Sequence, residues 1–427
     1  WIAVGLLIGA YLNYKLVAPR LRAYTEIAED AITIPDYFEK RFKDKSRLLR
    51  VISSLVIVIF FTLYTSAGVV AGGKLFEASF GLSYELGLFL TAGVVVAYTL
   101  FGGFLAVSLT DFVQGCIMFV ALITVPIVTY MVLGGSEPIL TEINAIDPTL
   151  LQMTTGVTVL GVISSMAWGL GYFGQPHIIV RFMAIATLKE VRAARHIGMS
   201  WMLVTLIGAV ATGILGLAYV TSTGAELTDP ETIFILLSQA LFHPLVGGFL
   251  LAAILAAIMS TISSQLLVSS SSLTEDFYKH FVRKGASQTE LVLVGRFSVL
   301  AVSLIAIALA FDRSSTILSL VSNAWAGFGA AFGPLILLSL FWRGMTRNAA
   351  LAGMVTGAAT VLIWIYAPFE INGMRPSDMM YEMVPGFALS LIVTLIVGFM
   401  TRTPSSALTE DFDSMKEAMR TGVIAPK

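Results

Sequence analysis

Long apolar runs recur along the whole chain, separated by shorter polar segments. Each run approaches or exceeds the roughly 20 residues that a helix needs to cross a bilayer. The alternation of apolar and polar residues that marks strands of a membrane barrel is missing from them. We therefore predict eleven transmembrane helices, at residues 1–20, 49–73, 84–108, 112–134, 155–180, 197–221, 242–272, 289–311, 314–342, 348–367 and 382–401.

The composition supports this interpretation of the pattern. Of the 427 residues, 57% are hydrophobic and only 12% are charged, and the mean hydropathy is +0.86. A soluble core does not require so much apolar surface. The sequence therefore predicts an all-α polytopic membrane protein that contacts the lipid bilayer. The net charge of −1 gives no indication of a nucleic-acid partner.

Residues suited to covalent chemistry are sparse. The single cysteine, Cys116, excludes an internal disulfide and a C-x-x-C motif, and the four histidines are scattered along the chain. We find no nucleophile paired with a base and no metal-ligand spacing. We therefore expect no enzyme and no cofactor, so that any uphill transport would draw on an ion gradient.

Lysine and arginine are distributed unevenly between the two sides that the predicted helices define. Alternate connections carry 23 of the 26 basic residues, and the opposite connections carry only Lys74, Arg313 and Arg375. Because basic residues accumulate in cytoplasmic loops, the tail at 403–427 is predicted to be cytoplasmic and to follow a transmembrane domain over 1–402. The chain begins inside an apolar run, and we expect leading helices to be missing from it.

The connection between the first two runs contains the signal of a short helix. Thr33 followed by Pro35 is typical of a helix start. Tyr37, Phe38 and Phe42 then favour an amphipathic helix on the cytoplasmic surface. The alternative is a solvated basic loop.

One run contains residues that oppose a helix at its centre. Within 155–182, Gly169, Gly171, Gly174 and Pro176 fall inside eight positions. A glycine costs a helix about 1 kcal/mol and a proline about 3 kcal/mol. Inside a bilayer, a loosened backbone is tolerated only where protein or a water-filled cavity surrounds it. Such broken helices are where secondary transporters expose backbone groups to a solute.

Aromatic and polar side chains accompany this break. Trp168, Tyr172 and Gln175 lie in it or beside it, and with the glycines and the proline they form a candidate solute site. The alternative is a packing role, because glycine and proline are frequent in membrane helices, where they allow kinks and close contacts.

A second stretch, 250–278, carries hydroxyl groups at mid-span. Ser260, Thr261, Ser263 and Ser264 follow small alanines that allow a neighbouring helix to approach. Hard cations prefer oxygen ligands, so neutral hydroxyls and freed carbonyls could hold Na⁺. Alternatively, the hydroxyls bond back to carbonyls one turn earlier in their own helix.

Three further features have two interpretations each. Asp111 is either the N-cap of a new helix or a charged functional group at membrane depth. The pair at 102–103, two glycines, marks a close helix crossing or a hinge. Tyr64, a polar aromatic residue at mid-span, is a packing residue or a ligand.

Several motifs match a known family. W-G-L-G-Y-F-G-Q-P-H-I at 168–178, Y-T-L-F-G-G-F-L-A-V-S-x-T-D at 98–111 and a looser L-A-A-I-x-S-T-x-S at 255–263 resemble the sodium/solute symporter family. P-D-Y-F at 35–38 and A-W-A-G-F-G-A-A-F-G-P at 324–334 extend the resemblance, which is strongest to the bacterial sodium/proline branch of that family.

This resemblance implies a fold of two inverted five-helix repeats, of the LeuT type, in which the first helix of each repeat is broken. The leading helix and the first core helix would be absent from this chain, and 155–182 would be the second broken helix. The implied function is sodium-coupled import of L-proline by alternating access across a bacterial cytoplasmic membrane, with no obligatory protein partner. Another small solute, such as pantothenate or a different amino acid, and a transporter-like sensor module are the alternatives.

The resemblance also implies roles for individual residues. The solute site would comprise the glycines of the break together with Trp168, Tyr172, Pro176 and Tyr64. Half of a sodium site would comprise Ala257, Ser260 and Thr261, and Asp111 would take part in sodium coupling.

Overall fold

The computed structural model consists of helices joined by short connections. It describes residues 1–313, 315–368, 370, 373–401 and 404–422, and only the backbone of 102–104. The elements of the first half are α1 (Ile2–Leu12), η1 (Asn13–Val17), α2 (Ala18–Ile27), α3 (Ile34–Phe42), α4 (Leu48–Phe80), α5 (Tyr84–Val132), α6 (Ser136–Ile146), α7 (Val159–Met166), η2 (Ala167–Phe173), α8 (Pro176–Met183) and α9 (Glu190–Thr223).

The second half continues in the same manner. Its elements are η3 (Pro230–Thr232), α10 (Ile233–Leu241), α11 (Pro244–Ser271), η4 (Ser272–Val282), α12 (Gln288–Ala310), α13 (Ile317–Phe341), α14 (Arg347–Tyr366), α15 (Pro376–Met379), α16 (Met383–Met400) and α17 (Ser406–Thr421). Over the described residues, ten helices are long and apolar enough to cross a membrane. The eleventh predicted run, 155–180, is the one that is interrupted.

The predicted boundary between the spans at 84–108 and 112–134 is wrong. Both lie in α5, a continuous helix of 49 residues. At 1.5 Å per residue, α5 is about 74 Å long, which is more than twice the thickness of a bilayer core of about 30 Å. Within its described residues, two segments are each long and apolar enough to cross a membrane, Tyr84–Phe101 and Leu105–Val132. The predicted hinge or crossing at 102–103 lies outside the residues whose surroundings are described.

Asp111 is accordingly not an N-cap. It lies inside α5, where the helix continues on both sides of it. The preceding Thr110 donates its hydroxyl to the carbonyls of Ala106 and Val107, one turn back in the same helix. A hydroxyl bonded in this way does not compete for the amides that a new helix would need to have capped.

The short helix α3 confirms the start that the sequence predicts. Thr33 is its N-cap and accepts a hydrogen bond from the amide of Asp36 at 3.1 Å. Tyr37 and Phe38 are fully buried within the protein core. Burial raises the pKa of Tyr37 to about 12, so its neutral hydroxyl shares a hydrogen bond of 3.0 Å with Ser339. The apolar face of α3 therefore packs on protein.

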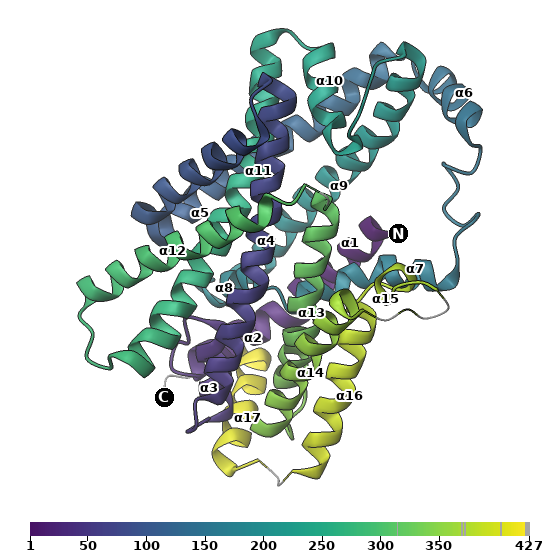
Figure 1. The fold of residues 1–427 in the computed structure, drawn as a ribbon. Helices are drawn as coiled ribbons and strands as arrows, with labels where there is room; N and C mark the ends of the chain where they lie inside the picture. The colour runs from purple at the N-terminus through teal and green to yellow at the C-terminus, as the bar shows by residue number, and fades with distance from the viewer. Residues whose placement is uncertain (314, 369, 371–372, 402–403, 423–427) are drawn as a thin grey trace.

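The helix α13 forms the centre of the molecule. Of its apolar window, 83% is buried, more than for any other candidate span in the described chain. It packs against α4, α14, α16 and η2 (Figure 1). Since small residues line α13 between Ala324 and Gly333, neighbouring backbones can approach it closely. This is the surface on which the interrupted helix rests.

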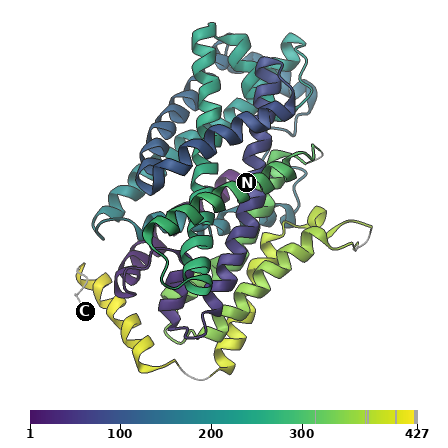
Figure 2. The ribbon, with the colours of Figure 1, turned by 60° about the vertical axis from the view of Figure 1, so that its left-hand side comes forward.

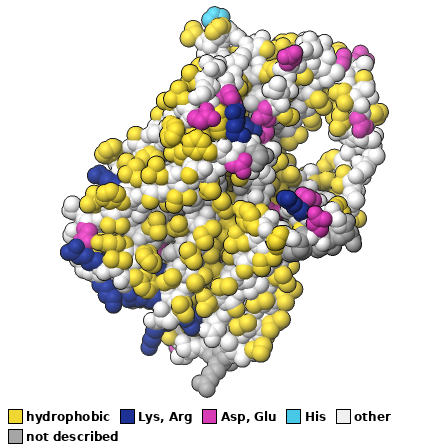
Figure 3. Space-filling model, in the orientation of Figure 1, with side chains coloured by type: hydrophobic (Ala, Val, Ile, Leu, Met, Phe, Trp, Pro, Cys, Tyr) yellow, Lys and Arg dark blue, Asp and Glu magenta, His cyan; other side chains and the backbone are white. Residues whose placement is uncertain are grey.

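The C-terminal helix α17 packs on α2 at the lower end of the molecule (Figures 1 and 2). Its Phe412 and Met415 are buried in the main core, and Asp411 pairs with Lys43 at 3.1 Å. On the face drawn in Figure 3, lysine and arginine gather toward the lower left, while much of the remaining surface is apolar. Such a surface suits a bilayer.

Candidate solute and ion sites

The run at 155–182 is broken, as predicted. α7 ends at Met166, a 3₁₀ turn η2 covers Ala167–Phe173, and α8 starts only at Pro176. Pro176 occupies the first turn of α8, where its missing N–H costs nothing. Glycines and a proline disfavour a helix here, but they do not break it by themselves: Gly327, Gly329, Gly333 and Pro334 also fall within eight positions, and α13 continues through them.

The glycines of the break are required by close backbone contacts. A Cβ on Gly169 would lie 2.1 Å from the carbonyl oxygen of Gly5 on α1, and one on Gly174 would lie 2.3 Å from a carbonyl oxygen of α13. A Cβ on Gly171 would lie 1.9 Å from Nε1 of Trp325. These glycines therefore have the packing role that the sequence left open as an alternative to a solute site.

Aromatic rings surround the same turn. Trp168 stacks on Tyr381, with ring centroids 5.3 Å apart, and Tyr172 meets Trp325 edge to face at 5.2 Å. The indole N–H of Trp325 donates to the carbonyl of Trp168 at 2.8 Å. The hydrogen bonds within a 3₁₀ turn have poorer geometry than those of an α-helix, and this additional bond from a side chain ties the break to α13.

Two more side chains satisfy the backbone around the break. Asn13 donates its amide to the carbonyl of Tyr172 at 2.8 Å, and Gln175 donates to the carbonyl of Trp325 at 3.0 Å. Gln175 is fully buried, and its own amide oxygen has no protein partner. Buried polar atoms are nearly always paired, so this oxygen is a candidate acceptor for a water or a solute.

Tyr64 reaches the interrupted helix from α4. Its ring lies against that of His177, with centroids 6.2 Å apart. His177 belongs to the first turn of α8, so Tyr64 contacts the half of the interrupted helix that follows the break. Trp168 and Tyr172, by contrast, lie in η2 before it.

The hydroxyls of α11 bond to their own helix. Ser260 and Thr261 both donate to the carbonyl of Ala257, at 3.1 and 3.0 Å. This is the back-bonded arrangement that the sequence leaves open as the alternative to ion binding. It also brings three oxygen atoms from Ala257, Ser260 and Thr261 together on one side of α11.

Asp111 connects three elements. Its carboxylate forms an ion pair with Arg181 of α8 and accepts a hydrogen bond from Ser264 of α11 at 3.2 Å. Arg181 also donates to Ser264 at 2.9 Å and to the carbonyl of His177 at 2.6 Å. A charged pair is costly to bury. Oδ2 of Asp111 accepts both of these bonds, whereas Oδ1 is buried and has no hydrogen-bond partner in the described protein.

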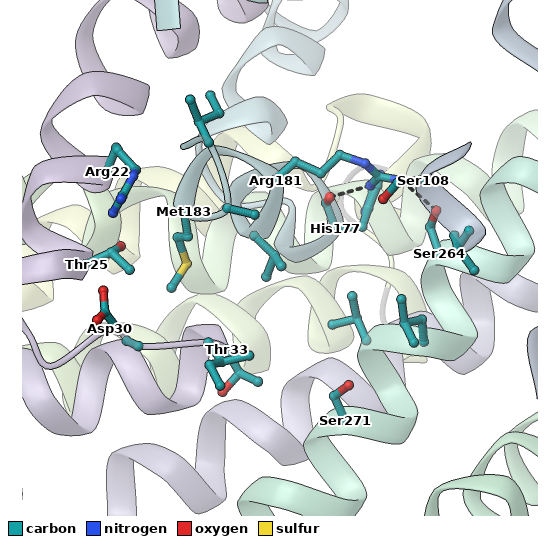
Figure 4. A pocket seen from close by; sticks show the side chains of 18 of the residues that line it. Arg22, Thr25, Asp30, Thr33, Ser108, His177, Arg181, Met183, Ser264 and Ser271 are labelled. Carbon is teal, nitrogen blue, oxygen red and sulfur yellow. Dashed lines mark hydrogen bonds between the residues drawn. The ribbon is translucent and has the colours of Figure 1, made fainter. Parts of the chain in front are cut away.

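A cavity of about 480 Å³ opens beside this pair. Its lining includes His177 and Arg181 of α8, Ser264 of α11, and Arg22 and Asp30 of the α2–α3 region (Figure 4). The volume lies within the range of about 300–1,000 Å³ found for small-molecule sites. Ser264, one of the four hydroxyl residues proposed from the sequence to hold Na⁺, lines it. The predicted solute-site residues and Ala257, Ser260 and Thr261 are not among its lining residues.

Three residues at these sites are absent from the sequence-based set. Trp325 lies in the motif at 324–334, but nothing local shows that its N–H points at the break. Tyr381 is 213 positions from its stacking partner Trp168, so the pair is invisible to any local pattern. Arg181 had a usable signal: it is the first basic residue after an apolar run, one turn after His177.

Two solved structures share the fold of this chain. The chain superposes on the substrate-bound outward-open state of a Na⁺-coupled sialic acid symporter with a TM-score of 0.77 and 19% sequence identity, over 95% of this chain and 84% of that one. It also matches MhsT in complex with L-phenylalanine, with a TM-score of 0.55 and 16% identity, over 93% of both chains. The predicted LeuT-like fold class is thus confirmed; the absence of its first core helix stays a prediction.

The sequence places the chain within this class. Residues 1–357 match the profile of the Sodium:solute symporter family, and the chain belongs to that family. It is 58% identical over 420 residues to the osmoregulated proline transporter OpuE of Bacillus subtilis, covering 98% of this chain and 84% of the relative. It is 57% identical to the high-affinity proline transporter PutP of the same organism and 54% identical to sodium/proline symporter 2 of Staphylococcus saprophyticus. These matches also cover 98% of this chain, and 87% and 83% of the relatives.

Proposed function

We propose that this protein imports L-proline together with Na⁺ across a bacterial cytoplasmic membrane. The observation that carries the proposal is identity of 54–58%, over 98% of the chain, to relatives named as proline transporters or sodium/proline symporters. The identity extends over almost the whole chain, so the segments of the proposed sites lie within the matched region. The distribution of lysine and arginine supports a cytoplasmic tail at 403–427.

The solute site is proposed at the break. Trp168 and Tyr172 flank the pyrrolidine ring, with Pro176 and Tyr64 beside them, and the backbone at Gly169, Gly171 and Gly174 meets the charged groups of proline. In support, the break presents two aromatic rings and an unpaired amide oxygen of Gln175. The carbonyls of Trp168 and Tyr172 accept side-chain donors in the present conformation, so solute binding there would exchange these bonds.

The sodium site is proposed on α11, with Asp111 in coupling. Ala257, Ser260 and Thr261 supply a carbonyl and two hydroxyl oxygens, which are the ligand type that a hard cation prefers. Both hydroxyls donate to the carbonyl of Ala257 in the present conformation, so ion binding would exchange these bonds. Rotation of either hydroxyl away from that carbonyl would aim its lone pairs at an ion.

Sodium would act by shifting a conformational population. An ion can do this only if it binds one state more tightly than the other. One charge moving through 100 mV supplies about 2.3 kcal/mol, which corresponds to roughly a fiftyfold accumulation of solute. The interrupted helix contacts α1, α13 and α11, and is therefore suited to link the solute site to the ion site.

The test is uptake of labelled L-proline by cells that lack their own proline importers, with sodium compared with choline. We expect sodium-dependent uptake, reduced at least tenfold by Trp168→Ala because the ring against the solute is lost. Trp201→Ala is the matched control, since that indole is partly exposed and lies between α9 and α5.

The other outcomes separate the alternatives. Sodium-dependent uptake of pantothenate or another amino acid, without uptake of proline, would contradict the proposed substrate and keep the transport class. Absence of a sodium response with any solute would contradict transport itself and favour a sensor or a structural protein.

A further inference from the structure

Arg181 places a permanent cation at the carboxylate that we assign to sodium coupling. Its guanidinium donates to Asp111 and to Ser264, and a second nitrogen donates to the carbonyl of His177. The arginine side chain is 40% exposed, on the wall of the cavity, whereas that of Asp111 is 18% exposed. Figure 4 shows Arg181 beside His177, with its guanidinium bonded to Ser264.

The oxygen atoms around this guanidinium would also suit a small cation. Asp111 contributes a carboxylate, one oxygen of which is buried and has no protein partner. Ser264 contributes a hydroxyl that lies 2.8 Å from the carbonyl of Ser260, a member of the proposed sodium site. Carboxylate, hydroxyl and carbonyl oxygens form the ligand set that hard cations take.

Arginine and a free cation cannot both occupy this position at low cost. With Arg181 in place, the pair with Asp111 is neutral. A sodium ion added there would lie next to a like charge, beside a carboxylate that is 18% exposed, where repulsion is screened less than in bulk water. Arginine cannot lose its proton to relieve this repulsion, so it would have to move.

Movement of Arg181 would involve the interrupted helix. Its bond to the carbonyl of His177 joins the guanidinium to the first turn of α8. The ion pair therefore holds α8 against α5 and α11 while the carboxylate is occupied by arginine. Release of the pair would remove this polar link of α8 to α5 and α11 and leave its apolar packing as the remaining restraint.

We propose that Arg181 is a positioning residue that competes with the coupling sodium ion for Asp111 and holds α8 in place when sodium is absent. This inference rests on the proposed function, because it takes Asp111 as the coupling residue. Arg181 would then be a further residue that takes part in transport. Sodium binding at Asp111 would directly weaken the attachment of α8, the helix that follows the break.

The experiment measures binding of radioactive Na⁺ to the purified full chain in detergent, with choline keeping the ionic strength constant. Arg181→Gln should lower the sodium concentration for half-saturation at least threefold, because the competing charge is gone. Arg181→Lys, which keeps the charge, should stay close to the unaltered protein. Arg192→Gln removes an exposed arginine on α9 and is the matched control.

A second set of measurements uses a variant of Asp111. In the background of Asp111→Asn, the effect of Arg181→Gln on sodium affinity should disappear, because the carboxylate for which both cations compete is absent. A purely structural arginine would destabilise the protein in both backgrounds and would not tighten sodium binding. Unchanged or weakened sodium binding in folded Arg181→Gln protein would overturn the inference.

The unaltered protein provides a test that does not depend on the folding of a variant. Sodium should accelerate hydrogen exchange at the amides of α8, whereas equal exchange in sodium and choline would overturn the inference. Failure of the proposed function is distinguishable. In that case the unaltered protein would bind no sodium and take up no proline, whereas failure of this inference alone would leave both intact.

Discussion

The two candidate sites differ in how their polar groups are satisfied. At the break, carbonyls released from the helix accept hydrogen bonds from distant side chains, with Trp325 and Asn13 as donors. On α11, the hydroxyls of Ser260 and Thr261 bond to a carbonyl of their own helix. The first site is therefore built by tertiary packing. The second can form in an isolated helix and can change partners without disturbing the fold.

This difference has consequences for mutation. A change at the break alters contacts among α1, η2 and α13 and should affect both folding and transport. A change at the α11 hydroxyls should affect ion binding with little loss of stability. The three predictions below test this contrast, from the largest expected effect to the smallest.

Gly174→Ala should be the most damaging of the three substitutions. The new Cβ would lie 2.3 Å from the carbonyl oxygen of Phe328 and 2.8 Å from the backbone nitrogen of Gly333, so backbones must separate. Overpacking of this kind typically costs about 1–3 kcal/mol. The measurement is the melting temperature of the purified protein.

The control for Gly174→Ala is Gly213→Ala. Gly213 lies in α9, and a Cβ there meets nothing within 4 Å. An open helical glycine replaced by alanine should gain up to about 1 kcal/mol. Equal melting temperatures for the two variants would contradict the packing role of the break.

Trp325→Phe should have an intermediate effect. The ring against Tyr172 is retained in part, but the carbonyl of Trp168 loses its donor. An unsatisfied buried acceptor costs about 1–3 kcal/mol. We expect a lower melting temperature and slower proline uptake.

Trp201→Phe removes a chemically identical bond, from an indole N–H to the carbonyl of Gly115 at 3.0 Å, away from the break. Because Trp201 is 37% exposed, its loss should leave uptake unchanged. A similar fall in uptake for both variants would show that the bond of Trp325 has no special part in the site.

Thr261→Val should be the mildest change in stability and the most specific in function. The Ala257 carbonyl lies within the regular hydrogen bonding of α11 and does not depend on the hydroxyl of Thr261. Loss of this bond should therefore lower the free energy of unfolding by no more than about 1 kcal/mol. If the hydroxyl binds sodium, the sodium concentration needed for half-maximal proline uptake should rise several-fold.

Thr205→Val is the comparison for this substitution, since its hydroxyl bonds to the carbonyl of Trp201 in the same back-bonded manner on α9. That variant should keep its sodium dependence. An unchanged sodium dependence in Thr261→Val would remove Thr261 from the proposed ion site.

Much of the fold could be predicted because a segment that crosses a membrane must be a long apolar helix, which is visible in the sequence. Apolar length identifies spans, and ten of the predicted runs reappear as helical spans, although two of them share α5. The start of α3 was predictable from Thr33 and Pro35, since capping is a local event. The continuity of α5 through Asp111 was not, because an aspartate can cap a helix or lie inside one, and only its partners decide.

The candidate sites likewise have a part that the sequence predicts and a part that it does not. A break at 167–175 was predictable as one of two such places, since Gly169, Gly171, Gly174 and Pro176 disfavour a helix, although Gly327, Gly329, Gly333 and Pro334 do so equally and α13 continues through them. The partners of the break were not, because Trp325 and Tyr381 lie 157 and 213 positions from Trp168 and reach it only through packing.

The sequence by itself determined which segments are long and apolar enough to cross a membrane, where residues that disfavour a helix gather, and which family the chain belongs to. Each of these depends on residue type and spacing along the chain. The tertiary structure decided that α13 supports the break and that Arg181 pairs with Asp111. Such contacts depend on which surfaces meet when helices pack, and a hydrogen bond between distant segments leaves no local trace in the order of the amino acids.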